Sequence, residues 1–101
     1  MTETQTQRNP IRVAMVGGGI TALTAAYELL HKHRATPVAI TIFEASTQLG
    51  GLAAGFKGRE QWEWPLEHFY HHIFTNDDAI IGLTRELGMG ERLAVYSPTT
   101  V

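Results

Sequence analysis

The stretch that decides the fold is IRVAMVGGGITALTAAYELL, residues 11–30. Its first six residues are almost continuously apolar and lead into three glycines, which is typical of a strand buried on both faces by helices. Apolar side chains then recur on one helical stripe, at Ile20, Leu23, Tyr27 and Leu30. The pattern predicts a strand over residues 11–16, a tight glycine turn and a helix that follows directly.

A second strand is predicted over residues 38–43, VAITIF, which are again largely apolar. The helix before it ends in the basic cluster 31–34, whose positive charge suits the negative end of the helix dipole. Pro37 stops a helix that runs this far. Strand, helix and strand within residues 11–44 have the length of a β-α-β unit, whose crossover is expected to be right-handed.

The glycine turn matches the dinucleotide-binding signature G-x-G-x-x-[G/A], which is carried here by Gly17, Gly18, Gly19, Ile20, Thr21 and Ala22. The first glycine makes the tight turn, the second leaves room for a pyrophosphate, and the last position must be small for close helix–strand packing. Backbone N–H groups at the helix start bind the phosphates. The sequence therefore predicts an α/β protein with a Rossmann-like FAD/NAD(P)-binding fold.

Glu44 closes the second strand, 22 positions after Ala22. An acid at this place accepts hydrogen bonds from the ribose hydroxyls of the adenosine. Taken alone, Glu44 would be interpreted as a solvated charge at a strand end, but the strand, loop and helix before it favour the ribose role. A carboxylate here also disfavours the 2′-phosphate of NADP.

Beyond the second strand the pattern is less regular. A small hairpin is predicted, pairing residues 53–56 with 61–64 around a turn at 57–60. Trp62 and Trp64 would share one face of its second strand, which Pro65 would end. Residues 66–74 receive no secondary-structure assignment.

A second helix is predicted near the end of the chain. Thr75 or Asn76 caps it, and Asp77 and Asp78 in its first turn suit the positive end of the dipole. Gly88 stands where a C′ glycine belongs. Its apolar stripe comprises Ile80, Leu83 and Leu87.

Composition excludes several classes of function. The net charge of −2, with basic residues scattered along the chain, lacks the clustered footprint of a nucleic-acid-binding protein. The absence of cysteine excludes disulfides, thiolate metal sites and cysteine nucleophiles. Residues 1–9 are polar and are predicted to be a disordered tail. No apolar run approaches the roughly 20 residues of a membrane span, so a soluble cytoplasmic protein is expected.

His68, His71 and His72 invite a metal hypothesis. A zinc site needs three or four convergent ligands, and the nearby Glu63 and Glu67 have no motif spacing, so no metal site is predicted. No catalytic triad or spaced carboxylate pair is present, and no catalytic residue is named. A role in core and hairpin packing is predicted for the aromatic residues Trp62, Trp64, Phe69, Tyr70 and Phe74.

The strings VAMVGGGITALTAAYELL and ITIFEASTQLGGLAAGF resemble the N-terminus of the FAD-dependent amine oxidase superfamily, with its protoporphyrinogen oxidases and phytoene desaturases. The shared features are the glycine loop, the acid of Phe43-Glu44-Ala45 and the doublet in Leu49-Gly50-Gly51. The resemblance implies FAD as cofactor, with Gly50, Gly51 and Leu52 against its pyrophosphate and ribityl chain and with Ala45 beside the ribose acid. Many members carry Arg where this sequence has Leu52.

The resemblance covers residues 11 to about 90 and implies an incomplete domain. Residues 10–101 would be the N-terminal part of an FAD-binding domain, while its remainder and the domain for a small-molecule substrate would be absent. It also implies that residues 66–72 lie near the flavin ring. Two parallel strands joined by one helix leave open sheet edges, which agrees with an incomplete domain. The expected function is that of a flavin-dependent oxidoreductase whose first 101 residues are inactive alone.

Three alternatives stay open at this point. UDP-galactopyranose mutases open in a similar way, and Leu52 in place of Arg permits a flavin-dependent mutase without net redox change. A non-enzymatic nucleotide-binding module of this length is the second alternative. NAD in place of FAD is the third, and the glycine doublet at residues 50–51 argues against it.

Overall fold

The computed structural model describes residues 9–32, 35–97 and 99. The chain divides into two compact units, Met1–Tyr70 and His71–Val101, and each is described by itself. The predicted N-terminal tail lies outside the described residues except for Asn9, which is exposed and has no regular structure.

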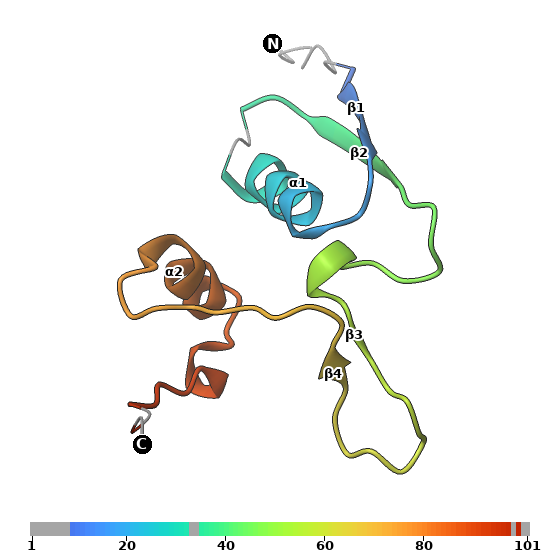
Figure 1. The fold of residues 1–101 in the computed structure, drawn as a ribbon. Helices are drawn as coiled ribbons and strands as arrows, with labels where there is room; N and C mark the ends of the chain where they lie inside the picture. Colours follow the sequence, from blue (N-terminus) through green and yellow to red (C-terminus); the bar gives the residue numbers. More distant parts are fainter. Residues whose placement is uncertain (1–8, 33–34, 98, 100–101) are drawn as a thin grey trace. The chain divides into compact units, whose positions relative to one another are not determined.

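A parallel β-α-β unit forms the first part of the chain (Figure 1). Strand β1 spans Ile11–Val16, helix α1 spans Ile20–Lys32 and strand β2 spans Val38–Phe43. The two strands pair in register from Ile11 opposite Val38 to Val16 opposite Phe43. The predicted strands are confirmed at both ends, and so is the Rossmann-like α/β fold class.

Helix α1 packs against the two-stranded sheet, and the side chains of the strands alternate in exposure accordingly. Val13 and Met15 of β1 are half-buried, whereas Val16 is 93% exposed. Ala26 of α1 is the buried apolar residue of the described chain. The prediction that the strands are buried on both faces is therefore wrong for these residues, because within the first unit only one helix packs on the sheet.

The C-terminal turn of α1 carries positive charge, as the sequence predicts. The ring of His31 stacks on Tyr27 with centroids 4.3 Å apart, and its Nδ1 lies 2.9 Å from the Tyr27 carbonyl oxygen. Lys32 forms an i,i+4 ion pair of 2.8 Å with Glu28. The other two members of the basic cluster, residues 33–34, lie outside the described residues.

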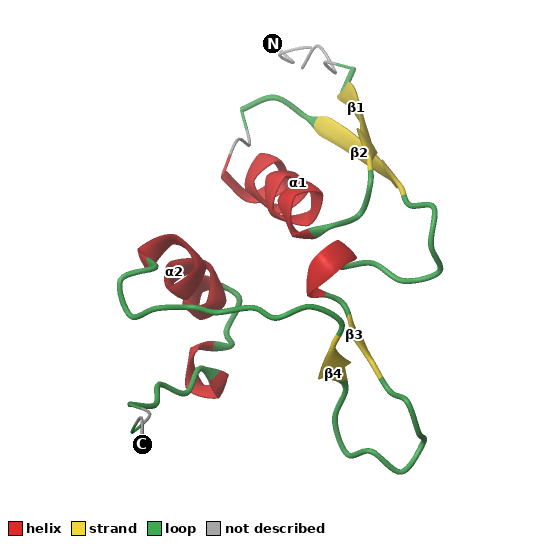
Figure 2. Cartoon of the chain, viewed as in Figure 1, coloured by secondary structure: helices red, strands yellow, loops and turns green. Residues whose placement is uncertain are grey.

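The hairpin exists, but its pairing differs from the prediction (Figure 2). Strand β3 is Gly55–Phe56 and pairs with β4, Leu66–Glu67, rather than with residues 61–64. A 3-10 turn, η1, occupies Gly51–Ala53, so only the end of the predicted first strand is extended. Pro65 precedes the second strand instead of ending it, because proline has no N–H to give to a ladder.

The nine residues between the two strands form a long loop, so Trp62 and Trp64 do not lie on a strand. The N–H of Trp62 donates to the carbonyl of Arg59 over 3.2 Å. The ring of Phe56 meets Trp62 edge-on at 6.1 Å and stacks on His68 at 4.4 Å. The contact with Trp62 joins the loop to β3, and this longer loop replaces the predicted short turn.

The second unit contains helix α2, Asp78–Glu86, and a 3-10 turn, η2, at Gly90–Arg92. The N-cap residue is Asp77, so the predicted cap at Thr75 or Asn76 is wrong by at least one residue. The carboxylate of Asp77 accepts a 2.7 Å hydrogen bond from the backbone N–H of Phe74, which places the helix start after this turn.

The C-terminus of α2 confirms the predicted C′ glycine. Gly88 has a φ of 76°, and its N–H donates to the carbonyl of Arg85 over 3.0 Å. The N–H of Met89 donates to the carbonyl of Thr84 over 2.9 Å, which completes a Schellman motif. Within the described ranges, no helix combines the length and apolarity that crossing a membrane requires.

Candidate functional site

Three segments that are distant in sequence meet at the carboxyl ends of β1 and β2. The N–H of Gly17 donates to the carbonyl of Phe43 over 2.7 Å, which joins the ends of the two strands. The N–H of Gly50 donates to the carbonyl of Gly18 over 2.8 Å, and Gly19 and Gly50 form a parallel bridge. The glycine loop, the end of β2 and the glycine doublet therefore form one hydrogen-bonded cluster.

Gly18 lies buried at the centre of this cluster. A Cβ at this residue would collide with the side chain of Leu49 and would lie 3.0 Å from Oε2 of Glu44. The sequence pattern predicts glycine here because a pyrophosphate needs the space. The structure adds a reason within the protein itself, because two side chains from the other segments already occupy the space beside Gly18.

Glu44 binds the glycine loop through its carboxylate. Its Oε2 accepts a 2.6 Å hydrogen bond from the N–H of Gly18, and its Oε1 accepts one of 3.1 Å from the N–H of Ser46. The bond from Ser46, followed by that from Gly18, holds the pKa of Glu44 below its ordinary value. The Glu44 carboxylate is therefore held as an ionised acceptor beside the glycine loop.

The first turn of α1 contributes backbone donors beside the loop. The first intrahelical bond runs from the N–H of Leu23 to the carbonyl of Gly19 over 3.0 Å. The N–H groups of residues 20–22 belong to the turn that has no acceptor within the helix. With the positive end of the helix dipole, these predicted site residues form the kind of donor set that binds phosphate.

The glycine doublet approaches the loop more closely than other residues would permit. Gly50 and Gly51 have positive φ angles of 114° and 58°. A Cβ on Gly51 would lie 3.1 Å from the Cα of Gly19, which is tighter than most real contacts of a Cβ atom. Of the remaining predicted site residues, Ala45 is exposed and Leu52, in η1, is 67% exposed.

Ser46 and Gln48 have a role in the site that was not predicted from the sequence. The Ser46 hydroxyl donates to the carbonyl of Gln48 over 2.7 Å and accepts from its N–H over 3.2 Å. The Gln48 side-chain amide donates to the carbonyl of Gly55 over 3.1 Å, which joins this turn to β3. A serine two residues after the strand-ending acid is a turn signal that identifies this segment in advance.

The predicted histidines divide between the two units. His68 stacks on Phe56 within the hairpin, and residues 68–72 are not helical, so the shared helical face considered for His68 and His72 does not form. Within residues 9–32, 35–97 and 99, no group of three His, Asp or Glu side chains converges as metal ligands.

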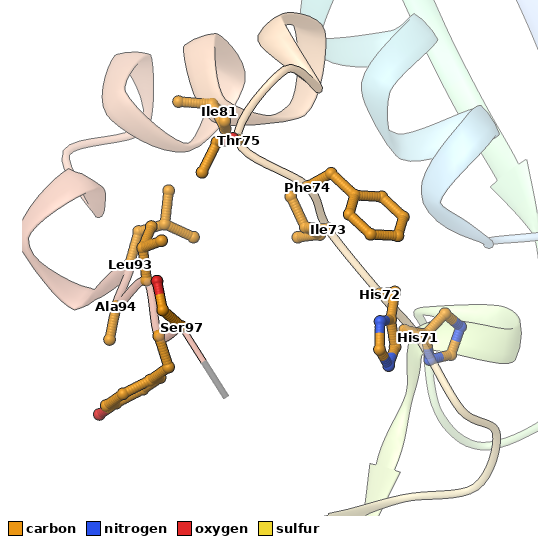
Figure 3. A pocket seen from close by; sticks show the side chains of 11 residues that line it. His71, His72, Ile73, Phe74, Thr75, Ile81, Leu93, Ala94 and Ser97 are labelled. Atoms are coloured by element: carbon orange, nitrogen blue, oxygen red, sulfur yellow. The ribbon is translucent and has the colours of Figure 1, made fainter. Parts of the chain in front are cut away.

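His71 and His72 border an open pocket of about 850 Å³ in the second unit (Figure 3). One side of it is formed by the extended segment 71–75 and the other by residues 93–97, with Ile81 contributed by α2. The ring of His72 lies 6.0 Å from that of Phe74. The lining is mainly apolar, and it belongs to the second unit alone.

Comparison with protein-family models matches residues 15–87 to the NAD(P)-binding Rossmann-like domain. The matched segment begins in β1 and ends after α2, so it includes the glycine loop, Glu44 and the glycine doublet. No curated protein and no solved structure gave a significant match.

Proposed function

The chain belongs to the NAD(P)-binding Rossmann-like domain family, and from this premise we propose that the dinucleotide it binds is FAD. The observation that carries the proposal is the pairing of the second glycine turn with the first, in which Gly50 bonds to Gly18 over 2.8 Å and bridges Gly19. Two stretches of glycine backbone thus border the pyrophosphate position instead of one. In the amine oxidase superfamily that the sequence resembles, this doublet lies against FAD.

The proposed roles follow from the chemistry of each segment. Residues 17–22 bind the pyrophosphate through backbone N–H groups and the start of α1. Glu44, with Ala45 beside it, binds the adenosine ribose through the acceptor sites that Gly18 and Ser46 leave open. Gly50, Gly51 and Leu52 border the pyrophosphate and ribityl chain. Bound FAD supplies the capacity to accept a hydride, while these residues bind and orient it.

The proposed activity of the protein is that of an FAD-dependent oxidoreductase of the amine oxidase, protoporphyrinogen oxidase or desaturase type. Its small-molecule substrate is bound, on this proposal, by parts other than the residues described here. The exposure of Val16 (93%) and Phe43 (58%) at the ends of the paired strands supports the view that the described sheet is part of a larger domain.

A titration of the chain with FAD, NAD⁺ and NADP⁺, followed by calorimetry and by flavin fluorescence, tests the cofactor assignment. We expect FAD to bind about tenfold more tightly than NAD⁺, which corresponds to about 1.4 kcal/mol. NADP⁺ is expected to bind most weakly, because its 2′-phosphate meets the carboxylate of Glu44.

Each deviation from this order overturns a different part of the proposal. If the affinity for NAD⁺ equals or exceeds the affinity for FAD, the proposed role of the glycine doublet is wrong. The chain would then be interpreted as a Rossmann-like NAD-binding domain. Binding of NADP⁺ as tight as that of NAD⁺ contradicts the ribose role of Glu44.

Leu52 supports a second candidate, a flavin-dependent mutase. Its exposed aliphatic side chain stands where many oxidoreductases of the superfamily carry Arg. A mutase turns over without consuming an electron acceptor, whereas the oxidoreductase requires one. Turnover of the FAD-loaded protein under strict exclusion of oxygen and other acceptors would favour the mutase.

A further inference from the structure

The loop between β3 and β4 contains a pocket that the dinucleotide site does not use. It has a volume of about 310 Å³ and is lined by Trp62, Glu63, Trp64 and Leu66. A volume of this size lies at the lower end of the range for small-molecule sites. The lining combines two indole rings and an aliphatic side chain with a single carboxylate.

One of the two indoles is positioned by packing. Trp62 is half-buried, and its ring meets Phe56 edge-on with centroids 6.1 Å apart. The indole also covers Gly58, where an added Cβ would lie 2.7 Å from Cη2 of Trp62. This ring is therefore held before any ligand arrives, so little conformational entropy is lost at this wall on binding.

The other indole remains largely in contact with solvent. Trp64 is 66% exposed although the sequence analysis predicted that it packs in the hairpin or the core. An exposed tryptophan that lines a pocket together with a fixed one is a feature of sites that bind a ligand between aromatic rings. Packing within the described hairpin leaves the Trp64 ring largely exposed, so the ring is available to a ligand.

The negative charge of the pocket lining favours a cationic ligand. The faces of indole rings carry negative electrostatic potential, and Glu63 adds a full negative charge. Glu63 forms no ion pair within the described chain. An anion is repelled by both features, and a neutral apolar ligand gains nothing from the carboxylate, whereas an organic cation is attracted by both.

We propose that Trp62, Glu63, Trp64 and Leu66 form a binding site for a small alkylammonium cation. The indoles and Leu66 contact its alkyl groups, and Glu63 neutralises its charge. Trp62, Glu63 and Trp64 belong to the hairpin loop and Leu66 to β4. None of the four is assigned to the pyrophosphate, the ribityl chain or the ribose, so cation binding can be measured without FAD.

Tryptophan fluorescence reports on this site alone, because Trp62 and Trp64 are the two tryptophans of the sequence. The chain is titrated with choline and, in parallel, with its neutral isostere 3,3-dimethylbutan-1-ol at constant ionic strength. We expect a saturable fluorescence change with choline and at least about threefold weaker binding of the isostere, as cation–π attraction at an exposed site predicts.

Glu63→Gln keeps the shape of the side chain and removes its charge, and we expect it to weaken choline binding about two- to fivefold. Glu60→Gln is the matched control, since it removes the same charge from the same loop outside the pocket lining and should leave binding unchanged. Circular dichroism of both variants verifies that they fold. Equal binding of choline and the isostere, equal effects of the two variants, or the absence of a saturable change would each overturn the proposal.

Discussion

The two loops that follow strands in the first unit are stabilised in different ways. The cluster around residues 17–19 and 50–51 is held by backbone hydrogen bonds and by one carboxylate that accepts from backbone. The hairpin loop at 57–65 is joined to β3 by the contact between the Trp62 and Phe56 rings, and His68 beyond β4 stacks on the same Phe56 ring. The first loop is therefore sensitive to a Cβ added at Gly18 or Gly51, whereas the second is sensitive to the removal of a ring.

The largest expected effect is that of Gly18→Ala. The new Cβ collides with the Leu49 side chain and approaches Oε2 of Glu44 to 3.0 Å, so both side chains must shift and the bond from Gly18 to Glu44 is disturbed. We expect a loss of stability of about 1–3 kcal/mol and the greatest loss of FAD affinity among these variants, measured by urea unfolding and calorimetry.

Gly82→Ala is the matched control for this substitution. Gly82 lies inside α2, and a Cβ there meets nothing within 4 Å, so alanine should stabilise the helix by about 0.5–1 kcal/mol. If Gly18→Ala left stability and FAD affinity as they are in the wild type, the close approach of the three segments would be wrong.

Glu44→Gln is expected to have the next largest effect, about a tenfold loss of FAD affinity. An amide oxygen replaces one carboxylate acceptor, but the amide nitrogen faces the N–H of either Gly18 or Ser46. Glu28→Gln, which removes an exposed charge from α1, is the control and should leave FAD affinity unchanged. An equal loss in both variants would assign the effect to net charge alone.

The pH dependence of FAD binding follows from the lowered pKa of Glu44. A depressed pKa in the folded state means that the stabilisation by this carboxylate is fully present above the ordinary pKa of glutamate. It is lost as the pH falls below that value and through the lowered one. We therefore expect FAD affinity and the stability of the first unit to decline together in this acidic range, and Glu44→Gln to remove that part of the decline.

The smallest effect is expected for Phe56→Ala, which removes the ring that contacts both Trp62 and His68. We expect a loss of about 1 kcal/mol and a red shift of tryptophan emission, with FAD affinity unchanged. Phe69→Ala is the control, because Phe69 is 55% exposed and makes no ring contact with another described residue. A loss of FAD affinity in Phe56→Ala would show that the two loops are coupled and are not stabilised separately.

The β-α-β unit was predictable because each of its signals is local. Apolar β-branched runs, three glycines and one helical stripe predict β1, α1 and β2 without reference to the rest of the chain. The hairpin was mispredicted because its register depends on contacts between Phe56, Trp62 and His68, whose effect cannot be derived from spacing. The start of α2 was ambiguous because residues 75–77 can all act as caps, and the bond between Asp77 and Phe74 decides among them.

The amino-acid sequence by itself determined the class of the fold, the bounds of the paired strands and the identity of the glycines and acid at their ends. These properties depend on backbone conformation and on hydrophobic periodicity, which act over a few residues. Only the tertiary structure showed that Glu44 binds Gly18, that residues 50–51 pair with the glycine loop and that Trp64 stays exposed beside a carboxylate. These contacts join residues distant in sequence or in a long loop, where chain geometry and not local propensity decides which groups meet.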